Sequence, residues 1–91
     1  MAQLRFEIWE GPESVECSAV SESWDRLRDK HAVRREIFHA STYEEAMAHH
    51  HQVNGWEPYR PIPGVTDIPF TEEQRSEQEA YLKMRPTDLS A

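Results

Sequence analysis

The sequence predicts an α+β fold, in which a three-stranded antiparallel or mixed sheet carries the first two helices on one face. Two stretches of alternating polarity flank a Gly-Pro turn near the beginning of the chain. A short helical segment, a third extended stretch and a helix with signals at both ends follow. This order of strand, strand, helix, strand and helix is typical of a small sandwich of helices on a sheet.

The first two strands are expected to form a hairpin. Residues 3–9 alternate between apolar and polar side chains, and residues 14–19 do so again, as half-buried strands do. Gly11 and Pro12 favour a turn between them. A right-handed crossover to the third strand would put the first strand in the middle of the sheet. The face left open would carry Arg5, Glu7, Trp9, Glu16 and either Arg34 or Arg35.

A short helix and the third strand follow the hairpin. Ser21 is a suitable N-cap for a helix over about residues 22–31, in which Trp24 and Leu27 lie on one inward face. Residues 32–39 then return to an extended pattern. The sequence therefore predicts that this helix connects two strands of the same sheet.

The second helix has specific signals at both ends. Ser41 and Glu44 have the spacing of a capping box, and Gly55 stands where a left-handed residue would end the helix after Asn54. On a helical wheel the inward stripe is centred on His50. We therefore expect one buried histidine in this helix.

The chain divides into four parts by composition. Residues 1–60 are expected to form a small α+β core domain, and residues 61–70 a proline-rich extended arm. A second capping box opens at Thr71, so residues 71–85 are expected to form a peripheral or conditionally ordered helix. Residues 86–91 should fray.

Charge excludes some classes of partner. The chain has 17 acidic and 10 basic residues and a net charge of -7, which disfavours nucleic acid and anionic membranes as partners. Half of the basic residues gather in one segment: Arg26, Arg28, Lys30, Arg34 and Arg35. We expect them to pair internally, with Glu22, Asp25, Asp29 and Glu36.

The cysteine content and the hydropathy pattern indicate a soluble, cytoplasmic protein. Cys17 is the single cysteine, so no internal disulfide can form, and it is expected to be a small buried side chain of the second strand. The first residues lack the apolar stretch of a secretory signal, and no apolar run is long enough to span a membrane.

Three consecutive histidines suggest a metal site, for which the candidate ligands are Glu45, His49, His50 and His51. Adjacent helical side chains diverge by about 100°, so the three histidines cannot all reach one ion. No paired-cysteine or HExxH spacing supports a zinc site. We therefore expect one core histidine with two at the boundary, no cofactor and no catalytic residue.

The stretch NGWEPYRP, which ends the second helix, has two interpretations. Trp56 and Tyr59 could fold back over the core as a structural clasp. Alternatively, with Arg60, they could form a recognition surface, because Trp, Tyr and Arg are over-represented at binding hot spots. Trp9, on the open face, is a further interaction candidate.

The motifs LRFEIWEG, FHASTYEEAM and NGWEPYRP together resemble a group of small bacterial proteins of unknown function. The resemblance covers about residues 3–61. It implies that the folded portion ends near Tyr59, and it implies no activity.

These observations favour a small acidic, non-catalytic protein–protein interaction or regulatory module. Its partner would be another protein or a second copy of the chain, as in a homodimer. The alternative is a small ligand- or metal-binding protein that uses the histidine-rich end of the second helix. An enzyme with His50 as its acid–base group is a third hypothesis, for which the sequence names no reaction.

Overall fold

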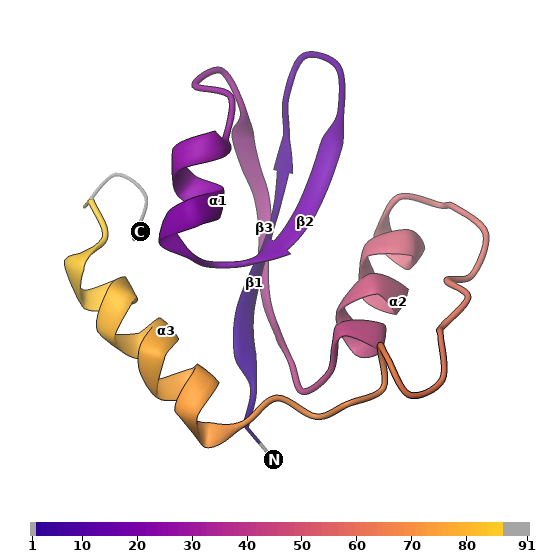
Figure 1. Cartoon of the computed structure of the whole chain (residues 1–91). Helices are drawn as coiled ribbons and strands as arrows, with labels where there is room; N and C mark the ends of the chain where they lie inside the picture. The colour runs from indigo at the N-terminus through magenta and orange to yellow at the C-terminus, as the bar shows by residue number, and fades with distance from the viewer. Residues whose placement is uncertain (1, 87–91) are drawn as a thin grey trace.

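The computed structural model describes residues 2–86 and shows one sheet flanked by helices (Figure 1). The strands are β1 (Leu4–Glu10), β2 (Val15–Ala19) and β3 (Val33–Ala40). The helices are α1 (Glu22–Leu27), α2 (Tyr43–Val53) and α3 (Glu72–Met84). Most of the segment expected to fray, 86–91, lies outside the described residues.

The predicted α+β class and the central position of β1 are confirmed. The strand order is β2-β1-β3, and β1 pairs with both neighbours in antiparallel fashion. Phe6 lies opposite Ala19 on one side and Phe38 on the other. The short loop with Gly11 closes the hairpin through a hydrogen bond from the Gly11 N–H to the Ser14 carbonyl, 2.8 Å long.

One face of the sheet carries the hydrophobic core. Its buried members come from β1, the end of β3 and α2: Leu4, Phe6, Ala40, Ala46 and Met47. The Phe6 ring stacks on Phe38 at 5.6 Å and lies 5.9 Å from Phe70, measured between ring centroids. The arm after α2 therefore returns to the sheet at Phe70 and closes the core. This apolar face arises because successive side chains of a strand point to opposite sides of the sheet, and the strands have apolar residues on this side.

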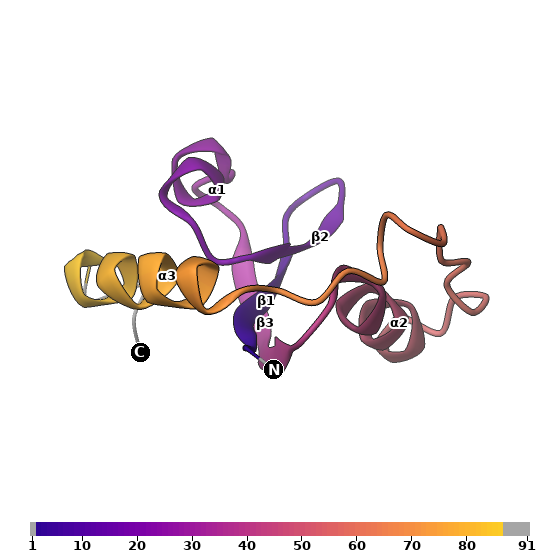
Figure 2. The same ribbon diagram turned by 60° about the horizontal axis from the view of Figure 1, so that its bottom comes forward.

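The placement of α1 corrects the expectation that both helices share one face. Figures 1 and 2 show α1 and α3 on one side of the sheet and α2 with the arm on the other. Helix α1 directs Asp25 and Arg28 inward and leaves Trp24 and Leu27 exposed, the reverse of the predicted orientation. The charged side of α1 faces inward because the sheet presents a buried carboxylate, Glu7, on that side.

The helix ends agree with the sequence except at the beginning of α2 and the end of α1. The N-cap of α2 is Thr42, whose hydroxyl accepts from the Glu45 N–H, and the Glu45 side chain in turn accepts from the Ser41 N–H. The capping interaction is thus one residue later than predicted. Helix α1 ends at Leu27, earlier than expected, because Arg28 takes an extended conformation. The capping box at Thr71 is present as predicted.

Helix α3 is attached to the sheet by a buried glutamine. The Gln78 side chain accepts from the Arg5 N–H at 2.7 Å and donates to the carbonyls of Arg5 and Val20 at 3.0 and 3.1 Å. At the end of the β1–β2 ladder, Gln78 thus serves as the hydrogen-bond partner of the Arg5 N–H and the Val20 carbonyl. Gln78 is the only buried residue of α3 itself, so the helix lies on the outside of the fold, as expected, and is anchored there by specific bonds. None of the helices within residues 2–86 has the length and apolar character needed to cross a membrane.

Candidate functional site

The end of α2 is fixed by a Schellman motif. Gly55 has φ of 69°, the left-handed conformation that glycine adopts without strain. Its N–H donates to the Gln52 carbonyl at 3.2 Å, and the Trp56 N–H donates to the His51 carbonyl at 3.0 Å. The chain therefore reverses at a defined position, and Trp56 is directed back along the last turn of the helix.

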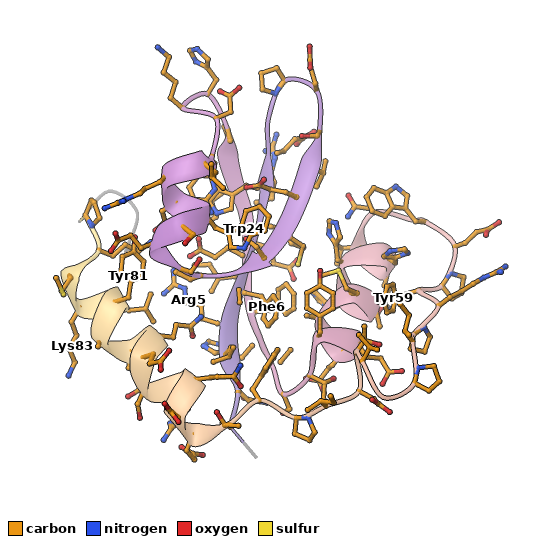
Figure 3. All side chains as sticks on the ribbon, viewed as in Figure 1. Arg5, Phe6, Trp24, Tyr59, Tyr81 and Lys83 are labelled. Carbon is orange, nitrogen blue, oxygen red and sulfur yellow. The ribbon has the colours of Figure 1, made fainter. Side chains whose placement is uncertain are left out.

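Trp56 and Tyr59 pack edge-on against histidines of this last turn. The Trp56 ring lies 5.0 Å from the His50 ring and 5.3 Å from the His51 ring, nearly perpendicular to both. Tyr59 lies 5.3 Å from His51 on another side, and Figure 3 shows it beside α2. The His51 Nδ1 is 2.9 Å from the Glu57 carbonyl oxygen. These contacts hold the rings in fixed positions.

The same residues leave much of their surface in solvent. Trp56 is 49% exposed although its ring contacts both His50 and His51. A shallow open cavity of about 470 Å³ is lined by six residues, which we call the aromatic surface: His51, Trp56, Glu57, Pro58, Tyr59 and Arg60. The rings of Trp56 and Tyr59 thus pack on the end of α2, as the clasp interpretation expects, while Trp56 leaves about half of its surface exposed. Chemically, the surface offers ring faces and edges together with one basic and one acidic group.

The histidines do not form a metal site. His49 contacts the Glu36 carboxylate and the Phe38 ring, whereas His50 is buried and contacts Asn54 and Trp56. Glu45 is occupied by the Ser41 N–H at the other end of the helix. Within residues 2–86 no group of three His, Cys, Asp or Glu side chains could hold a metal ion.

His50 is buried on the inward stripe, as predicted. Burial lowers the pKa of His50 below its ordinary value, and the neighbouring histidines His51 and His49 lower it further. A neutral imidazole in contact with Trp56 and Asn54 is consistent with a packed core side chain.

Trp9 is not an accessible interaction residue, which corrects that prediction. The side of the sheet expected to be open is covered, and Trp9 is 7% exposed. Its indole N–H donates to Glu7 at 2.9 Å, and the Arg28 guanidinium lies 4.0 Å above its ring. Arg28 Nη2 has no hydrogen-bond partner among the described residues, and the ring face takes its place as the contact.

Glu7 is the centre of a buried charged network. Its side chain is 1% exposed and accepts two hydrogen bonds from Arg85, at 2.8 Å each, and two from Arg5, at 2.7 and 3.1 Å. Arg34 lies 3.3 Å away. Burial alone would raise the pKa of Glu7, but hydrogen bonds from Arg85, Trp9 and Arg5 outweigh it and lower the pKa to about 2.

Asp25 and Arg85 connect this network to α1 and the end of α3. Arg85, with a side chain 0% exposed, also donates to Asp25 at 2.9 Å, and the Tyr81 hydroxyl donates to the same carboxylate. Burial opposes the ionisation of Asp25, yet the bonds from Arg85, Tyr81 and Arg28 lower its pKa. We call Glu7, Trp9, Asp25, Arg28 and Arg85 the charged interior.

The charged interior is a structural feature that the sequence did not reveal. Both carboxylates are held ionised by their partners, so neither has a proton to donate near neutral pH. The visible signals were a tryptophan on a face expected to be open, and the three-residue spacing between Asp25 in α1 and Arg28 at its C-cap. Nothing in the local sequence indicated that Arg85, far along the chain, would neutralise Glu7.

Four of the five basic residues of the segment 26–35 form internal ion pairs, as the sequence predicted, although two of them pair with acids other than those expected. Arg26 pairs with Glu22 at 2.6 Å, and Arg28 with Asp25 at 2.7 Å. Across the sheet, Arg34 contacts Glu7, and Arg35 contacts Glu10 at 2.7 Å. The charges of these arginines are therefore directed to acids of their own chain.

Cys17 is a free, partly buried thiol of β2 that packs against the core. Burial raises the pKa of Cys17 to about 12, and the negative charge of Glu36 raises it too. The thiol stays protonated near neutral pH and is a poor nucleophile. This agrees with the predicted role of a small buried side chain.

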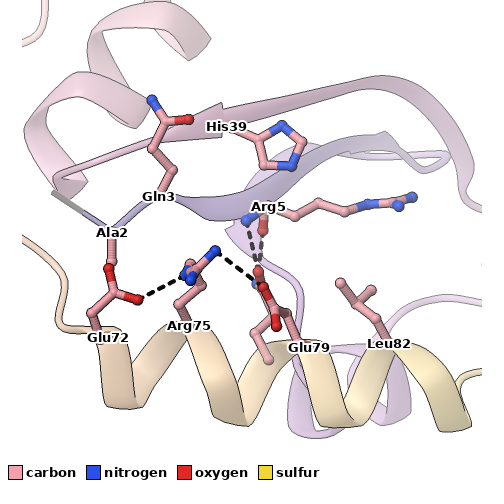
Figure 4. A pocket seen from close by; sticks show the side chains of 9 residues that line it. Ala2, Gln3, Arg5, His39, Glu72, Arg75, Glu79 and Leu82 are labelled. Carbon is pink, nitrogen blue, oxygen red and sulfur yellow. Dashed lines mark hydrogen bonds and ion pairs between the residues drawn. The ribbon is translucent and has the colours of Figure 1, made fainter.

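A second cavity, of about 440 Å³, lies between the start of β1 and α3 (Figure 4). Its basic groups already have partners: Arg75 pairs with Glu72 and Glu79 at 3.0 and 3.3 Å, and Arg5 pairs with Glu7. The charges of both arginines that line the cavity are thus already paired. The cavity presents no cluster that would select an ion of either sign.

Comparisons with protein-family models, with curated proteins and with solved structures found no match for this chain.

Proposed function

We propose that the chain is a non-catalytic protein–protein interaction module that binds its partner through the aromatic surface. The observation that carries the proposal is the state of Trp56, which is held by the Schellman motif and two histidine rings yet is about half exposed. An exposed aromatic side chain in one fixed orientation loses little conformational entropy on binding. It is therefore a suitable anchor for a partner.

The surroundings of the aromatic surface support a protein partner. Several large apolar side chains of α2 and the following arm are also exposed: Tyr43, Val53, Ile62, Val65 and Ile68. Scattered single residues of this kind are ordinary, but a group on one part of a small chain is typical of an interaction region. Arg60, at the margin, can donate to carbonyl or carboxylate groups of the partner. The net charge of -7 disfavours phosphate-bearing ligands.

The test compares Trp56→Ala with Leu27→Ala, which removes an exposed apolar side chain on the opposite side of the sheet. We expect Trp56→Ala to lower the free energy of unfolding by about 1–2 kcal/mol, since two edge-on ring contacts are lost and the fold is retained. A stoichiometric partner captured from lysate by cross-linking should be retained by Leu27→Ala. It should bind Trp56→Ala more weakly by about 2 kcal/mol or more in calorimetry.

Two results would contradict the proposal. One is a partner that binds Trp56→Ala as tightly as the unmodified chain, and the other is a partner that is lost with Leu27→Ala instead. Self-association is checked on the same variants by sedimentation equilibrium. A dimer that dissociates in Trp56→Ala but persists in Leu27→Ala would identify the partner as a second copy of the chain.

A further inference from the structure

A groove of about 360 Å³ lies between α1 and α3, away from the aromatic surface. It forms where β2 ends and the chain turns into α1, leaving the beginning of β1 beside α3. We call it the α1–α3 groove; its lining includes Leu4, Ala19, Val20, Glu22, Glu77 and Tyr81. Its floor is apolar, and its two carboxylates come from the two helices on either side.

The walls of the groove are fixed by hydrogen bonds. On one side, Gln78 is bonded to the main chain of Arg5 and Val20. On the other, the Tyr81 hydroxyl is bonded to Asp25 of α1, so that α1 and α3 are held at a set distance. Figure 3 marks Tyr81 on α3. A preformed cavity of this kind does not have to be opened by its ligand.

The rim of the groove is acidic and its charge is only partly compensated. Glu77 is exposed and makes no ion pair or hydrogen bond with a described residue. Glu22 pairs with Arg26, but both side chains are more than half exposed, and such pairs contribute little. A positively charged ligand at this rim would therefore compete only with the exposed Arg26 for Glu22, and with no described residue for Glu77.

We propose that the α1–α3 groove binds a short protein segment in which one apolar side chain is flanked by lysine or arginine. The apolar side chain would lie on Leu4, Ala19 and Val20, and the basic groups would pair with Glu22 and Glu77. Complementary charge at the rim gives the interaction its specificity, while burial on the apolar floor supplies affinity. This site is independent of the proposed function of the aromatic surface.

The experiment is an NMR titration of the full chain, labelled with ¹⁵N, using three capped peptides: KKLKK, KKSKK and EELEE. KKLKK should shift the amide signals of residues around the groove, Val20 and Tyr81 in particular, and the effect should weaken at high salt. KKSKK should bind more weakly because it lacks the apolar anchor, and EELEE should not bind.

The matched variants are Glu77→Gln and Glu13→Gln, since both remove one exposed negative charge and only the first lies at the groove. Glu77→Gln should weaken KKLKK binding by about two- to five-fold, the effect of one exposed ion pair. Glu13→Gln, in the β1–β2 loop, should leave binding unchanged.

Three results would overturn the proposal: equal weakening by both variants, equal binding of KKLKK and KKSKK, or shifts that appear at Trp56 and Tyr59 instead of the groove.

Discussion

Glu7 combines complete burial with a full negative charge, and its neighbours explain how both are tolerated. Removing a carboxylate from water costs several kcal/mol unless hydrogen bonds and opposite charges replace the water. Arg85, Arg5 and Trp9 supply these at 2.7–2.9 Å. Because Arg85 is itself fully buried, removal of either Glu7 or Arg85 leaves the other charge inside the protein with only part of its compensation, from Asp25 for Arg85 and from Arg5 and Arg34 for Glu7.

The low pKa of Glu7 predicts a specific loss of stability in acid. Its folded pKa of about 2 lies below its ordinary value of 4.5. The folded state therefore holds the ionised form more strongly, and this contribution is complete above about pH 4.5 and is lost as the pH falls through about 2. The lowered pKa of Asp25 acts in the same direction. Urea unfolding midpoints should fall steeply across this range of pH.

The variant Glu7→Gln separates this effect from the general acid response. It should lower the free energy of unfolding at neutral pH by about 3 kcal/mol, since Arg85 loses half of its countercharge, and it should flatten the acid profile. Glu10→Gln is the control because the Glu10–Arg35 pair is exposed, and we expect less than about 0.5 kcal/mol. Parallel acid profiles for the unmodified chain and Glu7→Gln would contradict the assignment.

Among the elements, α1 and α3 show where local sequence is informative and where it is not. The caps at Ser21 and Thr71 and the left-handed Gly55 were predictable because each depends on residues within one turn. The direction in which α1 faces was not predictable. Its apolar residues Trp24 and Leu27 indicated the wrong side, since a charge on a distant strand determined the packing.

The attachment of α3 predicts a measurable role for Gln78. Gln78→Ala removes the partners of the Arg5 N–H and the Val20 carbonyl, and we expect a loss of about 1–3 kcal/mol. Hydrogen exchange of the Arg5 amide should accelerate more than that of amides elsewhere in β1. Glu77→Ala changes the preceding residue, which is exposed, and should leave the free energy of unfolding and the exchange rate of the Arg5 amide nearly unchanged. Equal effects of the two substitutions would mean that Gln78 contributes only helix propensity.

At the scale of the whole molecule, the charged interior joins the two ends of the described chain. Glu7 and Arg85 are separated by 78 positions, and their contact spans everything between β1 and the end of α3. Periodicity and capping depend on residues that are close in the sequence, so they cannot predict such a pair. For this reason the core and the strand order were predicted, whereas the charged interior was not. Trp56, Tyr59 and Arg60 could be proposed as candidates from the sequence because they lie close together in the chain, directly after α2.

A chain that stops after Phe70 lacks α3 and the charged partner Arg85. The sequence suggested that such a chain would keep a folded core, whereas the contacts of Gln78 and Arg85 lead us to expect a loss of at least about 3 kcal/mol. Thermal unfolding can be followed by near-ultraviolet circular dichroism, which reports on the ordered aromatic side chains, the buried Trp9 among them. Arg85→Met in the full chain should reproduce most of the loss, because it removes the buried countercharge and keeps α3. The expectation is wrong if the shortened chain unfolds at the same temperature as the full chain. In that case α3 does not contribute to the stability of the core, and Arg5 and Trp9 alone are enough to stabilise Glu7.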